Sequence, residues 1–168
     1  MAATTINVNG IDYAVFGGGG DDSNPNKVID IISFDSTTKK INLVASGNLS
    51  IARKYLAATT INVNGIDYAV FGGGGSSSKV VDIITLITNS NGEKEVSLVA
   101  SGELSVERYN LAATTINVNG IDYAAKSNRS TDNSPEATKF IFLVVELKLI
   151  ISITLLGLLS SPPPPNTA

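Results

Sequence analysis

Cysteine, histidine and tryptophan are all absent from this chain of 168 residues. Without cysteine the protein can form neither a disulfide framework nor a thiolate metal site, and the redox compartment stays undetermined. Without histidine it lacks the commonest general base and the commonest metal ligand. These absences weigh against an enzyme, and we expect no catalytic residue, no cofactor and no bound metal.

Charge is also sparse, with 12 basic residues against 15 acidic ones. A balance this even predicts neither steering toward nucleic acid nor a strong attraction to anionic lipid. No basic patch with interleaved aromatic residues is present, so nucleic acid is not an expected partner. The N-terminus has no basic region followed by a long apolar run, and no secretory signal peptide is expected.

What the chain does have is repetition. The phrase AATTINVNGIDYA occupies residues 2–14 and returns unchanged at 57–69 and 112–124. Successive copies begin 55 residues apart. A regular period of this kind is typical of architectures in which similar units stack on one another. The third copy departs from the pattern, because AKSN replaces the VFGG that follows the first two copies.

Each phrase predicts a β-hairpin. In the second copy, Asn64-Gly65 lies between two runs rich in β-branched residues, which is the strongest local hairpin signal. A two-residue type I′ turn at this position sets the register of the two strands. It pairs Val63 with Ile66, Ile61 with Tyr68 and Thr59 with Val70. The glycines from Gly72 to Gly75 then end the second strand.

Two further strands are expected in each complete repeat. The segments 27–34 and 79–87 carry apolar residues on both alternating faces, which predicts strands buried on both sides. Shorter closing strands are predicted at 41–46 and 96–101. A repeat of four antiparallel strands that must cover both of its faces indicates stacked blades. The predicted fold is therefore all-β, an incomplete β-propeller of four-stranded antiparallel blades.

The pattern resembles the kelch repeat. That family's order is a leucine, an arginine, a strand of small residues, an Asn-Gly-type turn, a tyrosine, a glycine doublet and often an aromatic-Asp pair. The matching residues are Leu49, Arg53, Ala57, Ala58, Asn64, Gly65, Tyr68, Gly72 and Gly73 in the second unit, Tyr13, Gly17, Gly18, Phe34 and Asp35 in the first, and Leu104, Arg108 and Tyr123 in the third. The outer tryptophan of the family is missing, and Leu86-Ile87 replaces the aromatic-Asp pair in the second unit.

The resemblance implies a propeller that binds proteins, since most members of the family do so. A closed propeller needs at least about four blades. This chain supplies two complete repeats and a partial third, too few to close a ring alone. The predicted segments are 1–124 for the blades (1–46, 47–101 and the partial 102–124), 125–139 for a polar linker, 140–159 for a hydrophobic segment and 160–168 for a Pro-rich tail.

The hydrophobic segment 140–159 is long enough to span a bilayer as a helix, yet it carries Glu146 and Lys148 near its middle. The apolar gain and the cost of the two charges nearly cancel on the insertion scale. A membrane anchor, a buried strand or helix, and a non-native tail created by truncation or frameshift all stay open. With an anchor, the basic residues before the segment place the repeats in the cytosol; without one, the protein is expected in the cytoplasm.

Two segments partly match ligand-binding loops. The Gly72–Gly75 run lacks the Lys-Ser/Thr and helix that a phosphate loop needs directly after its last glycine, which favours structural glycines. The alternating oxygens of Asp22, Asn24 and Asn26 imitate the start of a calcium loop. However, Lys27 stands where the loop needs glycine and Ser33 where it needs an acid, which favours a solvated turn.

Recurring polar residues are expected to serve the architecture. Asp12, Asp67 and Asp122 hold the same position in each copy, which argues for a structural duty rather than a unique catalytic site. Arg53 and Arg108 also recur at one repeat position, and we expect them to satisfy backbone carbonyls between blades.

The leading interpretation is a non-enzymatic interaction module, a fragment or short form of a longer propeller. The loops that differ most between repeats are the expected binding sites for a protein partner. Their residues are Asp21, Asp22, Asn24, Asn26, Ser76, Ser77 and Ser78. Self-association through exposed blade faces and a membrane contact through 140–159 are further expectations. The alternatives are a degenerate gene product without independent function and a fragment of a kelch-type enzyme that lacks its catalytic blades.

Overall fold

The structure is a computed structural model that describes residues 1–75, 78–108, 110–128 and 141–143. Every regular element in these residues is a β-strand, which confirms the all-β prediction. Strands β1 (Ala2–Val8), β2 (Ile11–Gly20), β3 (Pro25–Asp35) and β4 (Lys40–Asn48) form one antiparallel sheet in that order, here called unit 1. Strands β5 (Ala57–Val63), β6 (Ile66–Gly72), β7 (Ser78–Thr88) and β8 (Lys94–Arg108) form a second such sheet, unit 2.

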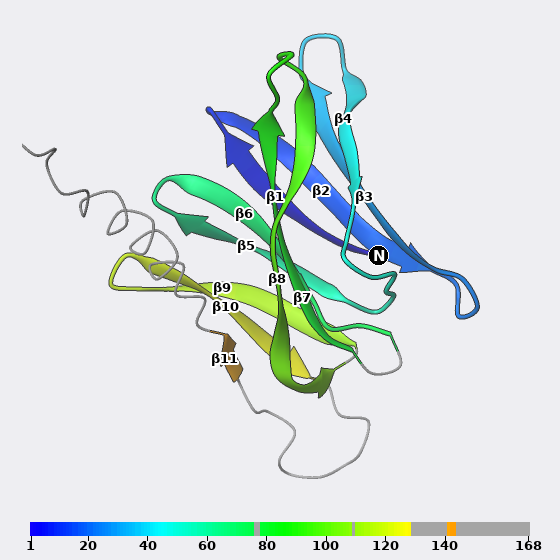
Figure 1. Cartoon of the computed structure of the whole chain (residues 1–168). Helices are drawn as coiled ribbons and strands as arrows, with labels where there is room; N and C mark the ends of the chain where they lie inside the picture. The colour runs from blue at the N-terminus through cyan, green and yellow to red at the C-terminus, as the bar shows by residue number, and fades with distance from the viewer. Residues whose placement is uncertain (76–77, 109, 129–140, 144–168) are drawn as a thin grey trace, which may run out of the picture.

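A third sheet has the order β11-β10-β9. Strands β9 (Leu111–Val118) and β10 (Ile121–Asn128) make up the third hairpin, and β11 (Ile141–Leu143) pairs with β10. In Figure 1 the hairpins β1–β2, β5–β6 and β9–β10 follow one another through the molecule. Contacts of β1 with β5 and of β5 with β9 hold this arrangement.

The hairpin register is as predicted. Val63 pairs with Ile66, Ile61 with Tyr68 and Thr59 with Val70, and the other two copies repeat the same pairing. The turn residues have positive φ, 54° at Asn64 and 82° at Gly65, as a type I′ turn requires. A short local sequence is therefore enough to determine this part of the fold.

The outer strands depart from the prediction in length. Strand β8 continues to Arg108, seven residues beyond the predicted end at Ser101, because Arg108 pairs with Ser78 at the start of β7. Strand β10 runs on to Asn128 and takes in the first four residues of the predicted linker 125–139. These extensions depend on pairing between segments that are distant in sequence, which local patterns do not report.

Two apolar clusters separate the units. The first lies between units 1 and 2 and includes Ile6, Ile31, Phe71 and Ile84. The second lies between unit 2 and the third hairpin, and Val81 and Ile83 belong to it. Since Ile83 and Ile84 of β7 belong to different clusters, this strand is buried on both faces, as predicted for 79–87.

For β3 the same prediction is wrong. Ile29 and Ile31 are fully buried against unit 2, but Ile32 is only half-buried and Phe34 is 62% exposed. In the described residues no further unit covers the outer face of unit 1. Strand β3 is therefore buried on the face toward unit 2 and exposed to solvent on the other.

The hydrophobic segment 140–159 contributes β11 through three of its residues. Its other residues, the polar residues 129–139 and the tail 160–168 lie outside the described residues. Among the residues described, no helix has the length and apolar character to cross a bilayer.

Candidate binding groove at the seam between the units

Arg53, in the segment between β4 and β5, ties this segment to unit 2 through its side chain. The guanidinium is 1% exposed and donates from Nη1 to the carbonyls of Gly73 (3.3 Å) and Val80 (2.6 Å) in unit 2. Its Nη2 forms an ion pair with the buried carboxylate of Asp82. The prediction that Arg53 satisfies backbone carbonyls is confirmed, but both carbonyls belong to unit 2, so its side chain does not bridge two units.

Burial governs the electrostatics of this arginine. Desolvation lowers the pKa of Arg53 from its usual value, and the nearby charge of Asp82 opposes that change. Asp82 also accepts from the Ser50 N–H (3.1 Å) and the Ser101 hydroxyl (2.6 Å), so both of its oxygens are occupied. Such added hydrogen bonds offset part of the desolvation cost of a buried ion pair. Nε of Arg53 is the exception, a buried donor for which the described residues supply no acceptor.

The backbone of the same segment is held by hydrogen bonds to both units. Arg53 donates its N–H to the Asn26 carbonyl (3.0 Å) and accepts from the Gly19 N–H (2.8 Å), both in unit 1. The Lys54 carbonyl accepts from the Gly75 N–H (2.5 Å) of unit 2. The residues that follow Arg53 are thus presented in a defined position at the seam.

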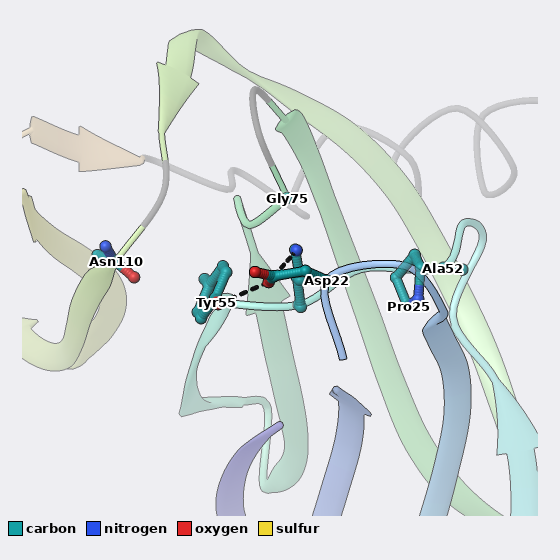
Figure 2. A pocket seen from close by; sticks show the side chains of 7 residues that line it. Asp22, Pro25, Ala52, Tyr55, Gly75 and Asn110 are labelled. Atoms are coloured by element: carbon teal, nitrogen blue, oxygen red, sulfur yellow. Dashed lines mark hydrogen bonds and ion pairs between the residues drawn. The ribbon is translucent and has the colours of Figure 1, made fainter. Parts of the chain in front are cut away.

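Beside this segment lies an open groove of about 790 Å³. It is lined by residues from the β2–β3 connection, the β4–β5 segment and the loops around Gly75 and Asn110, namely Asp22, Pro25, Ala52, Lys54, Tyr55, Gly75 and Asn110. Figure 2 shows Asp22 directed at Tyr55, with Ala52 and Pro25 on one side of them and Asn110 on the other. The groove therefore draws on both units and on the start of the third hairpin.

Three side chains give the groove its chemistry. Asp22 accepts hydrogen bonds from the Lys54 ammonium and from the Tyr55 hydroxyl (2.9 Å). The ammonium also lies 5.1 Å from the centre of the Tyr55 ring, within cation–π distance. The side chain of Asp22 is 79% exposed and Tyr55 is 49% exposed, so both remain accessible to a ligand.

These contacts shift two ionisations in opposite directions. The hydrogen bonds from Lys54 and Tyr55, with the charge of Lys54, lower the pKa of Asp22. The hydrogen bond to Asp22 and its negative charge raise the pKa of Tyr55, because phenolate would lose the donor and repel the carboxylate. At neutral pH the groove thus holds a carboxylate, an ammonium and a neutral phenol.

The structure places the predicted partner-binding residues in different settings. Asp22 lines the groove, whereas Asp21 closes its own turn by accepting from the N–H groups of Ser23 (2.8 Å) and Asn24 (2.7 Å). These two bonds lower the pKa of Asp21. Asn26 belongs to β3, and its side chain accepts from the Val28 N–H (3.2 Å).

Of the second predicted binding loop, residues 76–78, the structure describes only Ser78. Ser76 and Ser77 fall outside the described residues. Ser78 is buried as the first residue of β7, and its hydroxyl accepts from the Val80 N–H (3.2 Å). Ser78 therefore differs from the expectation of a loop residue, because its pairing with Arg108 draws it into the sheet.

Sequence reasoning missed Lys54, Tyr55 and Asn110. Tyr55 and Asn110 occupy the same repeat position and both have positive φ, 55° and 51°. Asparagine at this position is an ordinary left-handed residue, but a bulky tyrosine there is unusual. The available signal was that Lys54 and Tyr55 directly follow the recurring Arg53 in a connection between units.

The glycine runs have structural roles in the described residues. A Cβ on Gly18 would lie 2.7 Å from the Arg53 carbonyl, and the φ of Gly18 is +63°. The next described element after Gly75 is strand β7, which begins at Ser78, whereas a phosphate loop is followed by a helix. No group of three or more acidic residues able to hold a metal ion occurs among the residues described.

Recurrent Asp67 and Asp122 join neighbouring hairpins. The Asp67 carboxylate accepts from Asn62 Nδ2 in its own hairpin (2.6 Å) and from the Asn7 N–H in unit 1 (2.8 Å). Asp122 repeats both bonds one unit later, with Asn117 and with the Asn62 N–H. The predicted architectural duty is confirmed for these two residues.

Compared with protein-family models and with curated proteins, the sequence matches none.

Proposed function

We propose that the chain is a non-enzymatic interaction module of kelch-like, propeller-type blades that binds a segment of a protein partner in the seam groove. The observation that carries the proposal is the convergence of Asp22, from the connection between β2 and β3, with Lys54 and Tyr55, from the segment between β4 and β5, in one open groove. Repeat proteins commonly recognise partners through loops carried on a rigid scaffold, which is the position of this groove.

The lining suits a peptide better than a small metabolite. The groove is open, and it combines an exposed aromatic ring with a carboxylate and an ammonium that retain hydrogen-bonding capacity. Tyrosine is enriched at the energetic centres of protein interfaces. The buried Arg53–Asp82 pair beneath the segment holds Lys54 and Tyr55 in place before binding, which reduces the entropy lost on association.

The proposal is tested with a random peptide library displayed on phage and selected against the full chain. Enriched peptides are synthesised, and their affinity is measured by fluorescence anisotropy. Tyr55→Asn is the sharpest variant, because the equivalent residue Asn110 already has the same backbone conformation. We expect this variant to weaken binding about tenfold or more, as for loss of an aromatic hot spot of at least 1.4 kcal/mol.

Leu43→Ala is the matched control, since Leu43 is an exposed residue of β4 that does not line the groove. It should leave the affinity unchanged. Peptides that bind both variants and the wild type equally, or a library that yields no binder, would contradict the proposed groove function.

A degenerate product without independent function is the alternative, favoured by the exposed apolar side chains on the outer face of unit 1, such as Phe34. Urea unfolding of the full chain separates the two. A single cooperative transition supports a folded module, whereas a gradual loss of β signal supports a degenerate product.

A further inference from the structure

The outer face of unit 1 is a sequence copy of a face that unit 2 buries. Ala14, Phe16 and Ile32 of unit 1 hold the positions of Ala69, Phe71 and Ile84 in unit 2. The three residues in unit 2 are all 0% exposed, packed against unit 1. Their counterparts are only half-buried, and Phe34, the counterpart of Leu86, is 62% exposed. Unit 1 therefore presents an apolar face, and the equivalent face of unit 2 shows what kind of surface packs on it, namely the facing side of the preceding unit.

The polar contacts between neighbouring hairpins run in one direction. Each hairpin contacts the next one through the hydroxyl of its first threonine: Thr4 contacts Thr60 (Oγ1–Oγ1 2.7 Å) and Thr59 contacts Thr115 (2.7 Å). Each later hairpin also supplies the aspartate that accepts the Asn7 or Asn62 N–H of the hairpin before it (2.8 Å in both cases). One rule thus describes both junctions.

At the two ends of the array the same groups lack such contacts within the described residues. In unit 1, Thr5 and the second carboxylate oxygen of Asp12 hold the positions of Thr60 and Asp67, and both residues are exposed. In the third hairpin, Thr114 and the Asn117 N–H hold the positions of Thr4 and Asn7, and both residues are exposed. The exposed groups of unit 1 and of the third hairpin are therefore complementary, because they match the threonine and Asn–Asp contacts that join neighbouring hairpins inside the chain.

We propose that two copies of the chain associate head to tail, with the third hairpin of one copy covering the outer face of unit 1 of the other. Asp12 of one copy accepts the Asn117 N–H of its partner copy, and Thr5 contacts Thr114. The interface is heterologous, so it repeats until the ring closes. Two copies bring six inner hairpins, within the four to eight blades around which propellers close. A closed dimer with two such interfaces is the expected assembly, and it does not depend on the groove function.

One position makes this contact weaker than the one inside the chain. The ring of Phe71 lies over Gly17, where an added Cβ would be 2.7 Å from the ring. The third hairpin has Ser127 at the register of Gly17 and Gly72, so a serine replaces the glycine that Phe71 approaches inside the chain. We expect Ser127→Gly to strengthen association.

Cysteine cross-linking of the full chain tests the contact without background, because the natural chain has no cysteine. Thr5→Cys and Thr114→Cys are made as separate variants, mixed and oxidised. The expected result is a disulfide-linked dimer in the mixture that exceeds the dimer in either variant alone. Thr59→Cys with Thr115→Cys in one chain is the positive control, since these side chains already touch. It should form an intrachain disulfide and no dimer.

The mass of the wild type, measured by light scattering in a mild non-ionic detergent, should be twice the 17.5 kDa of one chain. Phe16→Ala should shift it toward the monomer, and Ser127→Gly should keep the dimer to lower concentration. Absence of the Thr5–Thr114 cross-link, homotypic dimers of equal abundance or a monomeric wild type would overturn the proposal. Higher multiples carrying the same cross-link support head-to-tail contact and overturn ring closure.

Discussion

Strands β3 and β7 have nearly the same sequence and the same place in their sheets, yet their surroundings differ. In β7 both faces are packed, so Ile83 and Ile84 are both buried. In β3 only the face toward unit 2 is packed, and Phe34 lies largely in solvent. Burial in a repeat array is thus decided by the neighbouring unit as much as by the side chains of the strand itself.

The acidic residues of these strands show the same contrast. Asp30 and Asp82 each accept from a serine hydroxyl of the adjacent strand (2.7 Å and 2.6 Å). Among the described residues only Asp82 also receives an arginine, Arg53 from the segment between β4 and β5. A single repeat position therefore holds a half-buried carboxylate in unit 1 and a fully buried carboxylate paired with arginine in unit 2.

The largest effects are expected from changes on the packed side of this comparison. Phe71→Ala should lower the free energy of unfolding by about 3–5 kcal/mol, as for removal of a fully buried aromatic ring. Phe16→Ala, at the same repeat position but half-buried, should cost clearly less in the monomer. Urea unfolding at low protein concentration measures both, and equal losses would show that the two faces are equally packed.

Arg53→Ala should cost about 3–5 kcal/mol, because it leaves the buried Asp82 carboxylate without its counter-charge. Replacing both partners, as Arg53→Met with Asp82→Leu, should recover part of that loss. Asp30→Ala, at the same repeat position but half-buried and without an arginine partner among the described residues, should cost clearly less. Thermal unfolding followed by circular dichroism compares the three variants, and a double variant no better than Arg53→Ala would contradict the ion-pair explanation.

Gly47 and Gly102 occupy the same repeat position but have different surroundings, and a smaller effect on stability is expected from replacing them. A Cβ on Gly47 would lie 2.6 Å from Val96 of unit 2, whereas a Cβ on Gly102 would meet no described atom within 4 Å. Gly47→Ala should therefore destabilise by about 1–3 kcal/mol through overpacking. Gly102→Ala should be neutral or slightly stabilising, which the same denaturation experiment reports. A costly Gly102→Ala would indicate that a further neighbour covers β8.

The smallest effect concerns ionisation in the groove. Because Asp22 raises the pKa of Tyr55, Asp22→Ala should move the phenol back toward its usual value of about 10. The phenolate absorbance of each protein minus that of its Tyr55→Phe derivative isolates this one tyrosine. An unchanged midpoint would mean that Asp22 and Tyr55 do not interact in solution.

The pKa of Asp22 is lowered, whereas that of Tyr55 is raised, and this predicts that the free energy of unfolding depends on pH in the acid range. Its pKa is lowered on folding, so the contribution of its contacts to stability is complete above the unfolded value of 3.8 and is lost as pH falls through the lower folded value. Wild type and Asp22→Ala should therefore converge in stability in strong acid. Acid unfolding curves of the two proteins measure this, and parallel curves throughout would contradict it.

The hairpins could be predicted because their determinants are local. Asn64 and Gly65 adopt positive φ in a two-residue turn, and the alternation of the flanking strands then leaves one register. The roles of Arg53 and Asp67 followed from their recurrence. The groove residues could not be found in this way, since Tyr55 is positioned by tertiary bonds to its backbone and to Asp22. The end of β8 was missed for the same reason, because its last residue pairs with Ser78.

The one-way contacts between hairpins make the length of the array a modular property. Removing or inserting 55 residues between two identical points of the phrase would join surfaces that already fit, so every remaining junction would keep its hydrogen bonds. Arrays with more or fewer units can therefore be built without redesign of any interface.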